Sequence, residues 1–107
     1  MTMTPIIDTD QVTVMDGVLL CPQCAGGYLH HSVVTVFNRK EDAPFTIETH
    51  VSVSGLAAIT SVPSRESRNP SARRDGVSIR FECELCGADD LELTVAQHKG
   101  QTLLAWR

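Results

Sequence analysis

Four cysteines, arranged as two pairs, give this sequence its clearest chemical signal. Cys21 and Cys24 form one pair and Cys83 and Cys86 the other, each with two residues between the thiols. This spacing lets both sulfurs of a tight turn face one metal ion, and two such turns supply the tetrahedral thiolate set that zinc prefers. A closed set of four protein ligands leaves no position for water, so we expect one Zn²⁺ with a structural role rather than a catalytic one.

Other uses of the cysteines are weaker alternatives. Two disulfides need an oxidising compartment, but the first residues lack the basic start and apolar run of a secretory signal. A redox-active pair needs a strand–helix–strand context that the sequence does not show. Iron also fits four thiolates, although one Trp, one Tyr and three Phe are few aromatic residues for an electron-transfer centre. We therefore expect zinc and a reducing, cytoplasmic location, and no apolar stretch is long enough to span a membrane.

Catalytic motifs are missing from the sequence. It contains no H-E-x-x-H, no G-x-S-x-G, no phosphate-binding glycine loop and no H-x-E of the kind that zinc deaminases use. The histidines His30, His31, His50 and His98 fall at strand or turn positions that are typical of surface groups. The sequence therefore favours a binding module over an enzyme.

Strands must position the two cysteine pairs, because alternation with a period of two runs through most of the chain. Apolar and polar residues alternate over 47–54, 77–83 and 91–95, which predicts half-buried strands with the apolar side inward. Residues 33–37 are mostly β-branched and apolar on both sides, as in a central strand. A single helical turn is conceivable at 55–59.

Two dipeptides predict tight hairpin turns. Asp16-Gly17 and Lys99-Gly100 each stand between two strand-like segments, and glycine suits the positive φ angles of two-residue turns. If Lys99-Gly100 is itself the second turn, Leu93 faces Trp106. A three-residue loop in its place would shift this register.

The segments CPQCAGG at 21–27 and CELCG at 83–87, each next to a strand-like run, resemble the knuckles of zinc-ribbon, or rubredoxin-like, proteins. Gly87 follows the last cysteine, where a residue free to take positive φ helps the chain leave the turn. Ala25 stands in the same place after the first pair, which would move this conformation one residue along. The whole chain also resembles small zinc-ribbon proteins of bacteria and their viruses, through residues 29–31, 69–76 and 91–107.

Resemblance and strand pattern together imply an all-β fold, a small antiparallel sheet of hairpins joined by the Cys₄ site. One zinc-ribbon-like domain is predicted over 1–107, with 1–10 as a loose N-terminus. The 58 residues between the two pairs exceed the roughly 15–20 of common Cys₄ motifs, so strands and a long loop must be inserted. We place this loop at 60–76, which holds two prolines, four serines and four of the nine basic residues. A mobile linker and an ordered binding loop both fit this composition.

The charge balance argues against nucleic acid or an anionic membrane as the general partner. Thirteen acidic residues stand against nine basic ones, and the net charge is −4. Acidic residues also gather around the second cysteine pair and would repel phosphate there: Glu82, Glu84, Asp89, Asp90 and Glu92. We therefore expect a protein partner or self-association.

Nucleic-acid binding through the Arg-rich segment 62–76 is the alternative. Its planar guanidinium groups suit phosphate because each can bond two oxygens at once. The candidate partner-binding residues of this segment are Arg65, Arg68, Arg73 and Arg74. Two acidic residues reduce the segment's charge to +2, and no aromatic residue within it can stack on a base. These arginines could instead pair with the acidic residues around the second cysteine pair.

Overall fold

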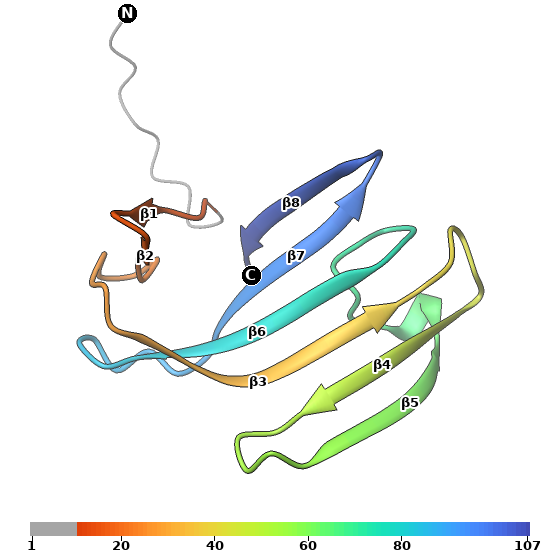
Figure 1. Cartoon of the computed structure of the whole chain (residues 1–107), viewed down its shortest axis with the longest axis horizontal. Helices are drawn as coiled ribbons and strands as arrows, with labels where there is room; N and C mark the ends of the chain where they lie inside the picture. The colour runs from red at the N-terminus through yellow and green to blue at the C-terminus, as the bar shows by residue number, and fades with distance from the viewer. Residues whose placement is uncertain (1–10) are drawn as a thin grey trace, which may run out of the picture.

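The chain folds into two antiparallel sheets (Figure 1). The computed structural model describes residues 11–107, so the N-terminus predicted over 1–10 lies outside the described residues. A small sheet pairs β1 (Val14–Met15) with β2 (Val18–Leu19). A six-stranded sheet has the order β5-β4-β3-β6-β7-β8, with β3 (Leu29–Asn38), β4 (Phe45–Val51), β5 (Ala57–Pro63), β6 (Gly76–Cys83), β7 (Leu91–His98) and β8 (Gln101–Trp106). The predicted all-β class is confirmed.

Both predicted hairpin turns are present. Asp16 and Gly17 have φ angles of 51° and 79°, and Lys99 and Gly100 have 50° and 77°. Positive φ at both central residues matches the twist of the flanking strands, which explains why each turn needs only two residues. The pairing of Leu93 with Trp106 confirms the predicted register of the last hairpin.

The segment 60–76 is not one loop, and its predicted boundaries are wrong. Thr60–Pro63 completes β5, which pairs with β4 along its whole length, and Gly76 already belongs to β6. The helical turn considered at 55–59 is also wrong, because the β-branched residues that follow favour a strand. A 3₁₀ helix, η1 (Ser64–Glu66), comes next, and the remaining loop is 67–75.

The loop packs tightly against the sheet. The Asn69 side chain donates a hydrogen bond to the Arg74 carbonyl at 2.7 Å, and the Ser71 hydroxyl donates to the Gln97 carbonyl of β7, also at 2.7 Å. A Cβ atom on Gly76 would meet the side chains of Asn69 and Pro70, so only glycine permits this approach. The contacts describe an ordered loop rather than a linker.

Alternate residues of the six strands form two different faces. Cross-strand pairs place one set together, here called the uncharged face, which contains Val34, Val36, Ile47, Thr49, Val51, Ile59, Val77, Ile79, Val95 and Leu104. The opposite set, here called the polar face, contains Thr35, Thr46, Glu48, His50, Ser78, Arg80, Glu92 and Thr94. Every charged side chain of β4 to β8 that points to either face in this central region belongs to the polar face.

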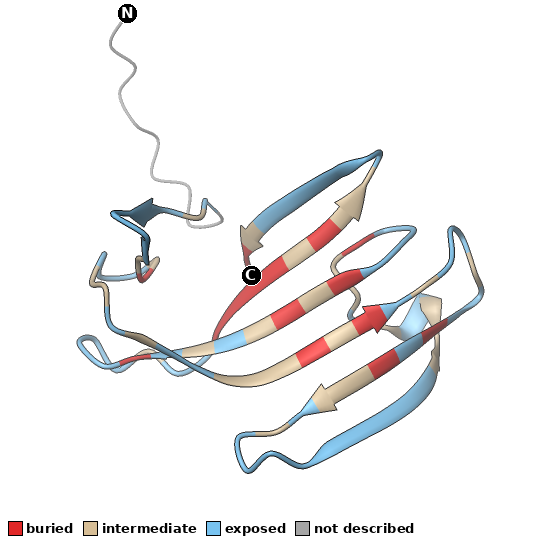
Figure 2. Cartoon of the chain, in the orientation of Figure 1, coloured by how far each residue is buried: buried red, intermediate tan, exposed pale blue. Residues whose placement is uncertain are grey.

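Burial reverses the expected sides. η1 and the loop 67–75 cover the polar face, where Glu48 and Glu92 are buried, while Ile47 and Ile59 on the uncharged face are exposed. Figure 2 shows the buried residues mainly in the central strands, with the edge strands β5 and β8 exposed along most of their length. The prediction that the apolar side of 47–54 lies inward is therefore wrong.

Within residues 11–107, only one end of the uncharged face is covered. The first cysteine pair and the β1–β2 hairpin pack there, around a core of Cys21, Cys83, Leu91, Leu93 and Trp106. The Trp106 ring is 4% exposed and meets Phe81 edge to face, with centroids 5.8 Å apart. This end, with both cysteine pairs, is called the metal end below. The far end carries the turn 39–44, η1, the loop 67–75 and the turn at Lys99-Gly100.

Candidate metal centre

The four predicted thiols meet at one point of the fold. Their sulfurs all lie within 4.8 Å of one another, with Cys21 and Cys86 at 3.8 Å and Cys24 and Cys83 at 3.5 Å. A tetrahedral ion with bonds of about 2.3 Å to sulfur separates its ligands by about 3.8 Å. The cluster therefore has the size and donor set of a four-coordinate metal site.

Two equivalent turns build this cluster. In the first, the Ala25 N–H donates to the Cys21 carbonyl at 2.9 Å, and the Cys21 N–H donates to the Gly26 carbonyl at 2.8 Å. The second turn repeats both bonds at the corresponding positions around Cys83, at 3.0 and 2.8 Å. Each turn thus aims one buried and one exposed sulfur at the same point.

The residue after each pair adopts the left-handed conformation. Ala25 has φ of 62° and Gly87 has 75°, so the prediction that the first turn shifts this conformation by one residue is wrong. Gly26 serves a different purpose: a Cβ there would lie 2.5 Å from Leu85 Cδ1 and 3.2 Å from Cys24 Sγ. The two turns approach each other across Gly26, and Ala25 accepts about 1–2 kcal/mol of backbone strain.

Hydrogen bonds and crowding set the acidity of the thiols. Backbone N–H groups of Cys86 and Leu85 lower the pKa of Cys83 to about 7, against the opposing effect of burial. At Cys24 the Gly26 N–H lowers the pKa, but burial and the neighbouring thiols raise it by more, to about 12. Thiols this close cannot all ionise alone, because each thiolate disfavours the next. A bound cation removes that repulsion, and so the cluster suits a metal better than free thiols.

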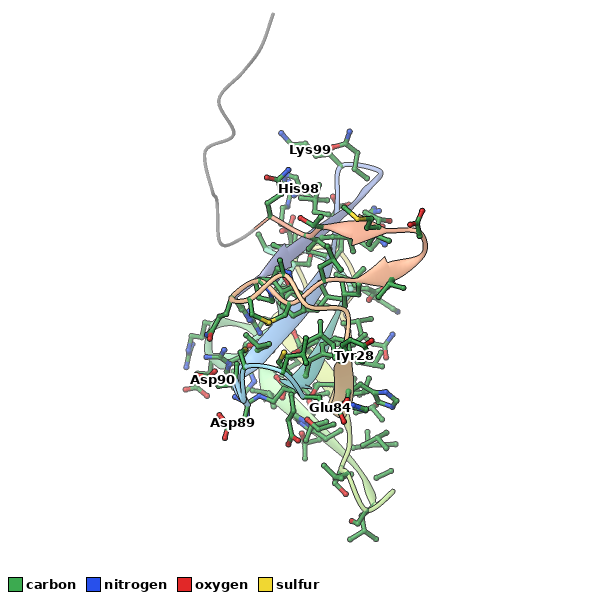
Figure 3. The ribbon with its side chains drawn as sticks, turned by 90° about the vertical axis from the view of Figure 1, so that its left-hand side faces the viewer. Tyr28, Glu84, Asp89, Asp90, His98 and Lys99 are labelled. Atoms are coloured by element: carbon green, nitrogen blue, oxygen red, sulfur yellow. The ribbon has the colours of Figure 1, made fainter. Side chains whose placement is uncertain are left out.

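Acidic groups outnumber basic ones around the metal end, and most basic groups lie at the far end. Figure 3 shows Glu84, Asp89 and Asp90 on one side of the view's centre and His98 and Lys99 at the opposite end of the sheet. None of the nine basic residues falls in 1–38 or 81–98. Four thiolates on one divalent ion would add two further negative charges there, which would disfavour phosphate at this end.

The histidines are not part of the thiol cluster within the described residues. His30 lies near it but is exposed, with Nε2 at 3.4 Å from Glu84 Oε2. His50 belongs to the polar face, where Thr35 and Glu48 hold its ring. The His50 side chain is 42% exposed, which agrees with its interpretation as a surface group, but the sequence did not reveal its two hydrogen-bond partners.

The four candidate arginines do not form a single patch. Arg73 pairs with Asp42 at 2.5 Å and with Glu41 at 3.7 Å, and Arg74 lies 3.5 Å from Glu41. The hydrogen bond from Arg73 lowers the pKa of Asp42. The acidic partners of Arg73 and Arg74 therefore lie at the far end of the sheet.

The other two arginines lie elsewhere. Arg68 pairs with Glu92 at 3.1 Å, and Arg65 is exposed on η1. The expected pairing with the acidic residues around the second cysteine pair is therefore found for Arg68 and Glu92. Within the described residues, no other candidate arginine pairs with an acid of that group.

Comparisons with known proteins give no relative: no protein-family model matches the chain, and no curated protein or solved structure is significantly similar to it. No helix among residues 11–107 has the length and apolar character needed to cross a membrane. The resemblance to zinc ribbons therefore stays a prediction from the sequence, and the site is interpreted from its own geometry.

Proposed function

We propose that the chain is a non-enzymatic zinc-ribbon module that mediates protein–protein interaction through its uncharged face, and that its partner there is a second copy of the same chain. The single observation that carries this proposal is the large apolar sheet surface that no part of residues 11–107 covers. One structural Zn²⁺ on Cys21, Cys24, Cys83 and Cys86 fixes the metal end, in a reducing compartment such as the cytoplasm.

Zinc is the ion that the donor set favours. Four thiolates in a closed tetrahedron suit zinc, and the sulfur separations fit its bond lengths. When bound, the ion supplies cross-linking between the two turns, not reactivity, because the four sulfurs fill its coordination sphere. The chain's own part is to hold Cys21 and Cys83 beneath the β1–β2 hairpin, where both are buried.

The uncharged face has the features of an interface rather than of a solvent-exposed surface. Ile59 is 71% exposed, Leu104 53% and Ile47 41%. Of the valines on this face Val51 is also exposed, and the others are half-buried. None of the residues that define this face carries a charge. Contiguous apolar surface of this kind on a soluble chain marks a contact with another protein or an aggregation hazard.

A second copy matches the face in shape, chemistry and area. Apolar sheet faces pack on one another about 10 Å apart, and a two-fold axis lets one patch serve both partners. Neighbouring strands lie about 4.8 Å apart, and roughly six residues of each strand are uncovered. The flat area of the face is then roughly 500 Å² on each copy, without the extra surface of the projecting side chains. Two copies then bury about 1,000 Å² or more, the lower bound for a specific interface. A charged partner finds no complement here.

Nucleic-acid binding has less support. It needs free guanidinium groups on one surface, whereas Arg68, Arg73 and Arg74 each pair with a carboxylate. The acidic residues at the metal end also disfavour contact with the phosphate groups of a nucleic acid. We keep it as the alternative that the salt-dependence experiment in the Discussion decides.

Two neighbouring leucines of β8 allow a matched test. Leu104 lies on the uncharged face and Leu103 on the other, with exposures of 53% and 44%. Leu104→Asp would place two carboxylates in a two-fold interface, and burying an unpaired charge opposes association by several kcal/mol. Sedimentation velocity of the zinc-loaded chain should show a dimer that Leu104→Asp converts to a monomer, with the dissociation constant of the dimer raised by more than about 100-fold.

Leu103→Asp is the control and should leave the dimer intact. Zinc content and circular dichroism of each variant confirm that folding is unchanged. A wild type that stays monomeric at high concentration, or equal effects of the two substitutions, would contradict the dimer.

A further inference from the structure

The polar face contains a pocket of about 450 Å³ beneath η1 and the start of the loop. Its floor is formed by Thr35, Ser78 and Phe37 of the two central strands, which are all buried. The volume lies in the range of small-molecule sites. The two sides of the pocket differ in charge, which narrows what it can bind.

A hydrogen-bonded chain around Glu48 forms one wall. Glu48 is 9% exposed, and its Oε2 accepts a hydrogen bond from the Ser67 hydroxyl at 2.5 Å. Its Oε1 lies 3.2 Å from His50 Nε2, and His50 Nδ1 lies 3.0 Å from the Thr35 hydroxyl. The carboxylate is therefore satisfied by the protein, and it fixes the His50 ring over the floor.

A second buried carboxylate, Glu92, anchors the opposite wall. It is 7% exposed and accepts hydrogen bonds from Arg68 at 3.1 Å, from Arg107 at 2.9 Å and from the Ser78 hydroxyl. Burial opposes ionisation, but these three donors together lower the pKa of Glu92 to about 2. Glu92 is thus ionised and holds two guanidinium groups at the pocket.

Positive charge is left over on this wall. Arg80 stands directly across from Glu92 in the β6–β7 pairing and lines the same pocket, but it forms no ion pair with any described residue. A guanidinium has five N–H donors, and Glu92 takes one from Arg68 and one from Arg107. Three cations therefore share one buried anion, with most of their donors unused.

We infer that this pocket binds a small molecule through one anionic group, a carboxylate or a phosphate, held by Arg80 together with the free N–H groups of Arg68 and Arg107. Planar guanidinium groups recognise both oxyanions with paired hydrogen bonds. The Thr35 and Ser78 hydroxyls and the His50 ring provide polar contacts for the rest of the molecule. Glu48 and Glu66, on the other side, disfavour a polyanion.

The pocket is also independent of the proposed dimer interface. It opens on the polar face, whereas the dimer uses the uncharged face of the same sheet. A monomeric wild type would therefore contradict the proposed function without affecting this inference. Conversely, a pocket that binds no oxyanion would contradict this inference without affecting the proposed dimer.

Inorganic phosphate and succinate are suitable probes for the two oxyanions. The zinc-loaded full chain is titrated with each at constant ionic strength, and backbone amide shifts are followed by nuclear magnetic resonance. We expect saturable shifts at Thr35, Ser78 and Arg80 with one probe or both, with half-saturation below about 10 mM. Phosphate alone identifies a phosphate ligand, and succinate alone a carboxylate ligand.

Arg80→Gln and Arg65→Gln are the matched variants. Arg80→Gln removes a charge-assisted hydrogen bond and should weaken binding about tenfold. Arg65 lies outside the pocket lining, so Arg65→Gln should leave binding unchanged. Failure of both probes to saturate, or an equal loss in the two variants, would overturn the inference.

Discussion

The two faces of the six-stranded sheet are made by alternate residues of the same strands, yet residues 11–107 cover the uncharged face only at its metal end. The described chain covers the polar face, where every buried polar group needs a hydrogen-bond partner, and leaves most of the uncharged face open. Ser67, Arg68 and Ser71 of the loop supply such partners. An apolar surface needs no specific partner group, and any matching apolar surface will cover it. The comparison teaches that the chain satisfies its own polar groups and leaves its apolar contacts to a partner.

Removing a metal ligand should have the largest effect, because the metal end is where the described part of the chain covers its own uncharged face. In Cys83→Ser, zinc binding is lost together with its contribution of about 10–16 kcal/mol in comparable small domains. We expect the β1–β2 hairpin to separate and Trp106, 4% exposed in the fold, to become accessible. Elemental analysis and Trp fluorescence measure the two losses.

Glu84→Gln, in the same turn but not a ligand, is the control and should retain about one zinc per chain. A metal-free protein that stays folded with free thiols would contradict a structural role for the metal.

The contribution of the polar face to the stability of the fold should depend on pH, whereas that of the uncharged face should not. Burial and its donors place the pKa of Glu92 at about 2, below its ordinary 4.5. A lowered pKa stabilises the fold above the unfolded value, and this contribution is lost as pH falls from about 4.5 toward 2. Glu92→Gln should lower the free energy of unfolding by about 1–3 kcal/mol at neutral pH, as expected for hydrogen bonds to a charged group.

The difference between wild type and Glu92→Gln should shrink through that same acid range in urea denaturation. The exposed Glu82, also replaced by Gln, is the control and should show no such change. Acid release of metal affects all three proteins alike. A constant difference at every pH would mean that Glu92 acts through its shape alone.

The arginines of the loop should give the smallest effect. Replacing Arg65, Arg68, Arg73 and Arg74 together with Ala removes the exposed pairs of Arg73 and Arg74, which are worth at most about 1 kcal/mol each. It also removes one of the two guanidinium partners of Glu92 and leaves the other, Arg107, in place. We expect negligible nucleic-acid binding at physiological salt for both proteins, measured by fluorescence anisotropy. Tight binding by the wild type that weakens steeply with salt and collapses in the variant would establish the nucleic-acid alternative.

The sequence predicts the local features of this fold well. The spacing of the cysteines and the glycines at the two hairpin turns are short-range signals, and the structure brings the four thiols together and keeps the Leu93–Trp106 register. Alternation also assigns residues correctly to a common face. These features depend on neighbouring residues, so a pattern can reveal them.

Which face the chain covers could not be predicted in the same way. Glu48 belongs to the polar residues of its strand, and only the loop that folds over it, with Ser67 as a donor, makes its burial tolerable. Similarly, Ala25 has a positive φ because the first turn repeats the hydrogen bonds of the second, in which Gly87 holds this position, and Gly26 is needed for the close approach to Leu85 of the other turn. Both outcomes depend on segments distant in sequence.

The separation of charge between the two ends gives the molecule an electric dipole along its strands. The far end carries seven of the nine basic residues, Arg39, Lys40, Arg65, Arg68, Arg73, Arg74 and Lys99, against four acidic ones, Glu41, Asp42, Glu66 and Asp75. Two copies stacked through the uncharged face have the lower electrostatic energy when their dipoles are antiparallel, with the metal end of each above the far end of the other. That orientation also sets the two β1–β2 hairpins at opposite ends of the stack, where they do not collide. Salt should relax this preference for orientation without dissolving the apolar contact.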